Sequence, residues 1–232
     1  MQHRFRWAAF QLDSLARCPS PKAIKNALDY LPRDLKETYK RMLDSISEDC
    51  RNNSVRLLQF LVHTYQPLTL SEAVEIIATD IEEDLLCFDV DGRVFGKEEV
   101  LRHCPSLISI VLRYRWGTAI KELHLTHFSV KEYLLRENQF KISTASISIT
   151  RTCLTYLTDI NSRHGDIHNF PMARYAAEAW TGYVALAQAS EDVVRAMIRF
   201  LVEEVTFQRW THLYQPDDNY PGPPHSSRLY YA

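Results

Sequence analysis

Helical periodicity is the feature that most constrains the fold of this chain. Apolar residues recur at three- and four-residue spacing through most of the sequence, and one complete i, i+3, i+4, i+7, i+8 pattern runs from Leu70 to Ala78. That spacing puts apolar side chains on one face of an α-helix. Thr69 and Glu72 stand before the stripe as a capping box, which marks a helix start. The sequence therefore predicts a mainly α fold.

Three helices are expected in residues 1–50. Their apolar stripes are separated by short loops that contain proline, so neighbouring helices should run antiparallel. Ser20 before Pro21 is typical of an N-cap followed by a first helical turn. Asp34 with Glu37 resembles a second capping box. We assign residues 1–50 as a helical segment.

Residues 51–140 combine helices with a β-hairpin. Ser54 is expected to cap one helix, the helix after Thr69 follows, and a short helix is expected near residues 97–104. Alternating apolar patterns predict two strands joined by a turn, at residues 107–112, Trp116–Gly117 and 122–128. The order helix–helix–helix–strand–strand is typical of a winged-helix domain with a small antiparallel hairpin.

The end of the second expected strand and the helix start that follows it bear on function. Period-two alternation would put Leu123, Leu125 and His127 on one face of the second strand. Ser129 and Glu132 resemble another capping box, so a helix should begin directly after that strand.

Residues 141–210 return to helical periodicity and predict a helical bundle, whose last helix Ser190 should cap. Residues 211–232 differ in composition. Four prolines lie between Gln215 and Ser227, which predicts a linker. A short apolar stretch follows the linker, and this pattern suggests that more chain continues beyond Ala232.

Composition excludes several classes of protein. The formal net charge is −2, from 27 basic and 29 acidic residues, so a strongly basic nucleic-acid-binding protein is not the default. No apolar run approaches the roughly 18 residues of a membrane span. Five widely spaced cysteines form no CxxC pair, which argues against both a disulfide framework and a zinc site. We expect a reducing, cytoplasmic environment and no membrane partner.

No catalytic motif is convincing. The nearest approach to a phosphate-binding P-loop runs from Gly92 to Lys97, but it has three residues between its glycines, and Glu98 occupies the magnesium-binding Ser/Thr position. His103 beside Cys104 is adjacency in sequence, which does not bring two side chains together on a helix. We expect no enzymatic activity from this chain.

Metal binding has two candidates. His124 and His127 are three apart on the expected strand and so on opposite faces, which is poor geometry for one metal ion. His164, Asp166 and His168 form a loose H-x-D-x-H in a loop. That loop is either a metal site or an ordinary solvated loop, and the second interpretation is the simpler one.

His127 and Ser129 are the candidate ligand-binding residues. They lie where a strand ends and a helix begins, and the amide donors at a helix N-terminus favour an anion. A histidine beside those donors could bind a phosphate oxygen. The alternative is a partly buried histidine that only caps or packs.

DNA binding is a weaker alternative. A winged helix would place its third helix in the major groove, but residues 97–103 carry Glu98 and Glu99 there. Phosphate contacts need clustered Lys and Arg. The segment from Arg113 to Trp116 is basic and aromatic, and it is the feature that favours DNA.

Several strings resemble fungal NACHT–ankyrin proteins, which are signalling NTPases of the NLR-like (STAND) type. The most specific is LTHFSVKEYL at residues 125–134. Residues 5–15 look like the end of the NACHT domain, and residues 31–43 look like its adjoining helices. Residues 66–73 and 125–134 look like the winged helix that is also found in GPI inositol-deacylase-like proteins. Residues 170–180 resemble the helical segment that follows, and residues 229–232 resemble the opening of an ankyrin repeat.

The resemblance implies a nucleotide switch. In that family the nucleotide sits between the NTPase core and the winged helix, and a histidine in the matching motif touches the ADP phosphate. The matching residue here is His127, with Ser129 in the same motif. The P-loop and the acidic magnesium-binding strand of the family have no counterpart in this sequence, so ADP or ATP would need an upstream NTPase domain.

The expected function is therefore a non-catalytic regulatory or interaction segment of a NACHT-type protein, with the winged helix as lid on a nucleotide. Its partners would be other domains of a larger polypeptide or separate proteins. The first alternative is a nucleotide-independent protein-interaction scaffold, and the second is a DNA-binding winged helix.

Overall fold

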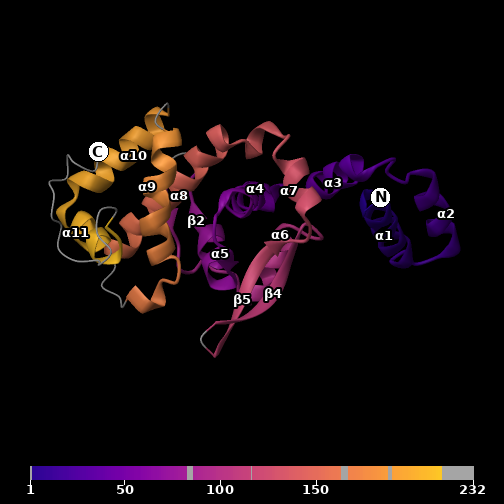
Figure 1. Cartoon of the computed structure of the whole chain (residues 1–232), viewed down its shortest axis with the longest axis horizontal. Helices are drawn as coiled ribbons and strands as arrows, with labels where there is room; N and C mark the ends of the chain where they lie inside the picture. The colour runs from indigo at the N-terminus through magenta and orange to yellow at the C-terminus, as the bar shows by residue number, and fades with distance from the viewer. Residues whose placement is uncertain (1, 83–85, 116, 163–166, 188–189, 216–232) are drawn as a thin grey trace.

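The computed structural model of the chain describes residues 2–82, 86–115, 117–162, 167–187 and 190–215. Its secondary structure is mainly helical with a small antiparallel sheet, which confirms the expected fold class. Three groups of elements follow one another along the long axis: an N-terminal arm, a middle part that carries the β-hairpin, and a C-terminal group of helices (Figure 1).

The N-terminal arm contains the three expected helices, α1 (Gln2–Ala16), α2 (Pro21–Asp29) and α3 (Leu35–Asp44). Both expected caps are confirmed. Ser20 Oγ accepts a hydrogen bond from the Ala23 amide at 3.2 Å, and Asp34 Oδ1 accepts one from the Glu37 amide at 2.8 Å. Local signals in the sequence therefore set where α2 and α3 begin.

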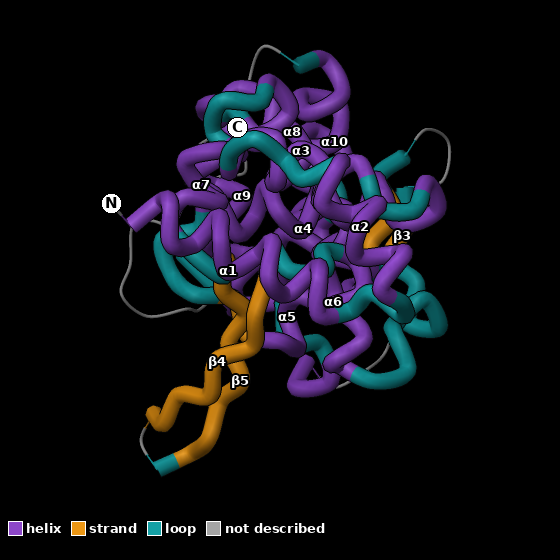
Figure 2. Tube along the Cα trace, turned by 90° about the vertical axis from the view of Figure 1, so that its right-hand side faces the viewer, coloured by secondary structure: helices purple, strands orange, loops and turns teal. Residues whose placement is uncertain are grey.

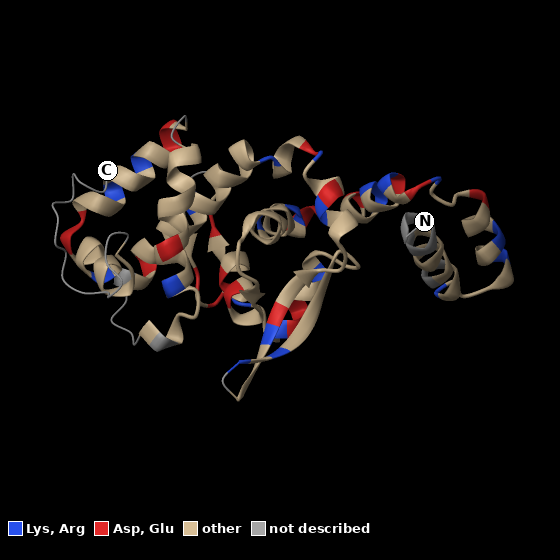
Figure 3. Cartoon of the chain, viewed as in Figure 1, with Lys and Arg blue, Asp and Glu red and all other residues tan. Residues whose placement is uncertain are grey.

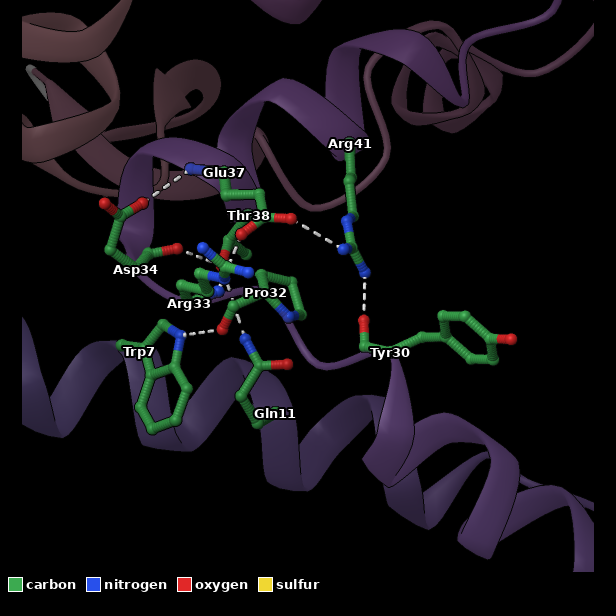
Figure 4. A network of polar contacts seen from close by, with 9 residues as sticks. All are labelled: Trp7, Gln11, Tyr30, Pro32, Arg33, Asp34, Glu37, Thr38 and Arg41. Atoms are coloured by element: carbon green, nitrogen blue, oxygen red, sulfur yellow. Dashed lines mark hydrogen bonds and ion pairs between the residues drawn. The ribbon is translucent and has the colours of Figure 1, made fainter.

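The capping box at Asp34 is only half formed. The Glu37 carboxylate accepts from the Arg33 amide at 2.8 Å, one residue before the N-cap, and not from Asp34 itself. The loop before α3 is also fixed to α1, as Figure 4 shows, because Trp7 Nε1 donates to the Pro32 carbonyl at 2.8 Å. This second contact spans 25 positions and is not visible in the sequence pattern.

The middle part holds the hairpin and the helices around it. Its elements are α4 (Glu48–His63), β1 (Leu68–Thr69), α5 (Leu70–Ile77), β2 (Thr79–Asp80), β3 (Cys87–Phe88), the 3-10 helix η1 (Lys97–Glu99), α6 (Val100–His103), β4 (Ile108–Arg115), β5 (Thr118–Leu125), α7 (Phe128–Leu134) and the 3-10 helix η2 (Asn138–Phe140).

Two antiparallel sheets occur in this part. The larger has the order β1-β5-β4, and the smaller pairs β2 with β3. The β4–β5 hairpin projects from the body of the chain in both views (Figures 1 and 2). Gly117 has a φ of +80°, which glycine adopts without strain, so the expected turn forms there. Trp116 lies outside the described residues.

The structure corrects three local expectations. The second strand ends at Leu125, so His127 does not share a strand face with Leu123. Ser54 does not cap a helix, because α4 begins at Glu48 and Ser54 lies inside it. The strands β1, β2 and β3 were not expected, since a two-residue strand is too short to show alternation. The capping box of Thr69 and Glu72 is confirmed.

The C-terminal group consists of α8 (Ile142–Ser162), the 3-10 helix η3 (Ile167–Asn169), α9 (Ala173–Ala187), α10 (Glu191–Val202) and α11 (Glu204–Leu213). Ser190 occupies the N-cap position of α10 but makes no side-chain cap bond. The indole rings of Trp180 and Trp210 lie 5.2 Å apart, and Phe200 packs on both. The sequence indicated the bundle but did not separate α11 from α10.

Buried side chains from the middle part and the C-terminal group belong to one hydrophobic cluster. Phe88 of β3 illustrates the continuity, since its ring contacts Tyr156 of α8 at 4.6 Å and Phe170 at 6.2 Å. Residues 51–140 and 141–210 therefore share a core across their proposed boundary. No helix in the described ranges is both long and apolar enough to pass through a lipid bilayer.

Candidate functional site

His127 is the N-cap residue of α7. Its backbone is extended, with φ −164° and ψ 154°, and its Nδ1 accepts a hydrogen bond from the Ser129 amide at 3.1 Å. Ser129 is consequently the second residue of the helix and not its cap. The expected capping box of Ser129 and Glu132 is wrong, because the helix begins at Phe128 and the imidazole accepts the Ser129 amide hydrogen that Glu132 would accept in such a box.

Ser129 links His127 to a residue far away in the sequence. Its Oγ lies 2.7 Å from His127 Nδ1 and also 2.7 Å from the hydroxyl of Tyr39 on α3. Ser129 and Tyr39 are both buried, whereas His127 is half-buried. The structure thus brings the two predicted site residues together and adds Tyr39, which the sequence showed only as one member of an apolar stripe.

A groove of about 260 Å³ lies beside His127. The chain segment from β5 to α7 lines it with His124, His127 and Lys131, and the loop after α4 contributes Tyr65 and Gln66. The groove is large enough for a phosphate-sized anion together with water. Its basic and hydrogen-bonding side chains give it the chemistry that an anion needs.

The Phe128 ring lies beside the imidazole, with the two ring centres 4.3 Å apart and an angle of 40° between the planes. This contact and the bonds from Ser129 hold the His127 ring from two sides. An imidazole held in this way is pre-organised, so a ligand in the groove would not need to order it first.

His124 lies in the same groove but is bound to a buried carboxylate. Its Nε2 is 3.0 Å from Oε2 of Glu122, and Arg115 Nη2 donates to the other carboxylate oxygen at 2.9 Å. Arg113 Nε lies 3.9 Å from Glu122 as well. One buried negative charge therefore offsets the basic residues of the hairpin, whose ribbon carries acidic and basic segments next to one another (Figure 3).

The pair His103 and Cys104 has no features of a nucleophile and its base. Burial raises the pKa of the Cys104 thiol to about 12, and the thiol donates to the Ser54 carbonyl at 3.7 Å. Burial, and then the charge of Arg56, lowers the pKa of His103. His103 Nδ1 is buried without a hydrogen-bond partner, so it does not bond to the neighbouring sulfur.

The segment from Gly92 to Lys97 forms turns and the start of η1. The Gly92 amide donates to the Asp89 carbonyl at 3.1 Å, and Lys97 Nζ donates to Ser71 Oγ at 2.7 Å. The lysine that would reach a phosphate in a P-loop is thus bonded to a helix of its own chain.

Metal-binding clusters are absent from the described residues. His164 and Asp166 of the H-x-D-x-H string lie outside those residues, and the side chain of His168 is not described either. A larger cavity of about 480 Å³, between α8 and α11, contains Arg209 and His212 but none of the residues around His127.

Comparisons with known proteins give one distant relative. The chain is 31% identical over 206 residues to the azaphilone pigments biosynthesis cluster protein L of the fungus Monascus ruber. The match covers 82% of this chain and 43% of that protein, so the chain spans less than half the length of its relative. No known protein-family profile and no solved structure matches the chain.

Proposed function

We propose that this chain is a non-catalytic regulatory segment of a larger NACHT-type signalling protein. In this proposal residues 51–140 form a winged helix that acts as a lid on a nucleotide bound by a neighbouring NTPase domain. The observation that carries the proposal is the position of His127, which is held by Ser129 at the edge of a basic groove. The resemblance of residues 125–134 to the matching motif supports it.

The winged-helix assignment is supported by the order of the elements. Three helices, α4, α5 and α6, precede the β4–β5 hairpin, and the short strand β1 pairs with β5 to complete a three-stranded sheet. The relative's greater length fits a segment that works within a longer polypeptide.

His127 would make the direct contact with a phosphate oxygen, and Lys131 would supply a positive charge from the next turn of α7. Ser129 would act through His127, because its amide and hydroxyl are already bonded within the chain. A hydrogen bond to a charged group contributes about 1.5–3 kcal/mol, which is enough to change a two-state balance about tenfold or more. Exchange of ADP for ATP would remove this contact and release the lid.

The test is the rate of ADP dissociation from the full-length protein. His127→Ala should speed ADP release by about tenfold or more, because it removes the phosphate contact. His212→Ala, on the exposed side of α11, is the matched control and should leave the rate unchanged. An unchanged rate in His127→Ala would remove this role from His127 and favour the scaffold alternative.

The scaffold alternative is favoured by the outer surface of α2. None of its residues is buried, and Ile24 and Leu28 are exposed on it together with the neighbouring Tyr30. An apolar surface of this kind is typical of an interaction site. In that case the chain would bind protein partners whether or not nucleotide is present.

DNA binding is the weaker alternative. Arg113 and Arg115 both form ion pairs with the buried carboxylate of Glu122, which offsets part of their positive charge. Titration with duplex DNA at several salt concentrations separates it from the others. A steep loss of affinity with salt would support DNA binding, since released counterions drive phosphate contacts. The proposal also puts the protein in the cytoplasm, where the five cysteines would stay reduced.

A further inference from the structure

A chain of hydrogen bonds, the first buried and the second partly buried, connects the N-terminal arm to the groove. It runs from the Tyr39 hydroxyl on α3 to Ser129 Oγ and from there to His127 Nδ1, and both steps measure 2.7 Å. Tyr39 and Ser129 are 90 positions apart in the sequence. Tyr39 is almost fully buried, with 1% of its surface exposed, so water does not compete for its bond to Ser129.

The direction of each hydrogen bond follows from the chemistry of the donors. The Ser129 backbone amide can only donate, so His127 Nδ1 accepts and carries no hydrogen. Because Nδ1 has no hydrogen to give, the Ser129 hydroxyl donates in the contact with Nδ1, and a lone pair of Oγ accepts from the Tyr39 hydroxyl. The neutral imidazole consequently carries its hydrogen on Nε2, and it offers a donor of the kind that a phosphate oxygen accepts.

Tyr39 also holds the arm in place. Its ring packs edge-on against Phe10 of α1, with ring centres 6.0 Å apart, and against Tyr133 of α7 at 5.6 Å. Figure 1 shows α3 reaching the rest of the molecule beside α7. The residue that docks the arm and the residue that starts the hydrogen-bond chain are therefore the same.

We infer that Tyr39 is a positioning residue that couples the docking of the arm, residues 2–44, to the orientation of the His127 ring. A docked arm keeps the Tyr39 hydroxyl on Ser129 Oγ, and the Ser129 hydroxyl in turn holds His127 Nδ1. Coupling of this kind is reciprocal, so a ligand on His127 would also favour the docked arm. The nature of that ligand rests on the proposed function, but the coupling itself does not.

The first measurement is nitrogen-15 NMR of the His127 ring in the whole chain without nucleotide. The wild-type chain should show an unprotonated Nδ1 and a protonated Nε2. Tyr39→Phe keeps the ring and removes only the hydroxyl, so Ser129 Oγ–H is free to turn away and both ring-nitrogen signals should shift. Tyr133→Phe removes a hydroxyl from the neighbouring ring and should leave both signals in place. Unchanged signals in Tyr39→Phe would overturn the inference.

The second measurement is a double-mutant cycle of Tyr39→Phe and His127→Gln in urea unfolding. Because the two residues share one chain of bonds, the unfolding constant of the double variant should differ at least about twofold from the product of the single effects. Hydrogen exchange of the α3 amides should rise in both single variants. Purely multiplicative effects would contradict the coupling.

These readouts separate the inference from the proposed function. Coupling observed without any change of ADP release in His127→Ala would support the inferred role of Tyr39 and reject the proposed contact between His127 and a nucleotide. Absence of coupling together with faster ADP release in His127→Ala would support the proposed contact with a nucleotide and reject the role of Tyr39.

Discussion

A buried carboxylate on α5 gives the sharpest prediction about stability. Glu75 is 2% exposed, and its Oε2 accepts from Arg93 Nη2 and from the Tyr156 hydroxyl, both at 2.9 Å. Arg93 Nε lies 2.7 Å from Oε1 as a further charge contact. The guanidinium also stands over the rings of Phe88 and Phe170, 5.5 and 5.8 Å from their centres. The Glu75 side chain therefore links α5 to the loop after β3 and to α8.

The cost of Glu75→Ala can be worked out from these contacts. Tyr156 is fully buried, and its hydroxyl would lose its acceptor, which costs about 1–3 kcal/mol. Burial, and then the nearby Glu75 charge, raises the pKa of Tyr156 well above its ordinary value, so it remains a donor. Breaking a buried ion pair costs about 3–5 kcal/mol, but Arg93 is 28% exposed and water screens part of its charge. We expect a total loss of about 3 kcal/mol.

Urea unfolding followed by far-ultraviolet circular dichroism measures this loss. Glu75→Gln should fall between the wild-type chain and Glu75→Ala, because an amide oxygen can still accept from Tyr156. The matched control is Glu99→Ala, which breaks a surface pair with Arg102 and should cost at most about 1 kcal/mol. The reasoning is refuted if Glu75→Ala loses no more stability than Glu99→Ala at an unchanged slope with urea.

Two further predictions concern titration and thiol reactivity. The lowered pKa of His103 means that the unfolded chain binds a proton more readily, so stability should fall as pH drops below about 6.5, and His103→Gln should flatten that pH dependence in urea unfolding. Equal pH profiles for the two proteins would contradict it. Burial raises the pKa of both the Cys104 and Cys153 thiols, so both should resist alkylation in the native chain and react after unfolding, which mass spectrometry of labelled peptides can follow. Fast native labelling of either thiol would show that its site opens.

Helix starts were the part of the fold that the sequence predicted best. The caps at Ser20 and Asp34 and the capping box of Thr69 and Glu72 all formed, because each depends on residues three positions apart. The same rule failed at Ser129, where the sequence pattern allowed two caps. His127, two residues earlier, took the amide of Ser129, and the serine hydroxyl turned to Tyr39.

The candidate site was predicted in part. The motif placed His127 and Ser129 at a strand-to-helix junction, and the structure puts them in direct contact beside a groove. The sequence did not assign three features to the site beforehand: Tyr39, Lys131 and the ion pairs of Glu122. Their roles depend on which helices and strands meet, and no spacing rule within one element reports that.

The sequence by itself determined the mainly α fold, the hairpin and most of the helix starts, because these depend on interactions between residues a few positions apart. Only the tertiary structure decided what the polar groups do. The bond between Tyr39 and Ser129 spans 90 positions and that between Tyr156 and Glu75 spans 81. A polar side chain removed from water must find a partner wherever packing supplies one. In this chain packing supplied those partners from distant segments, and so fixed both the buried charge of Glu75 and the orientation of His127.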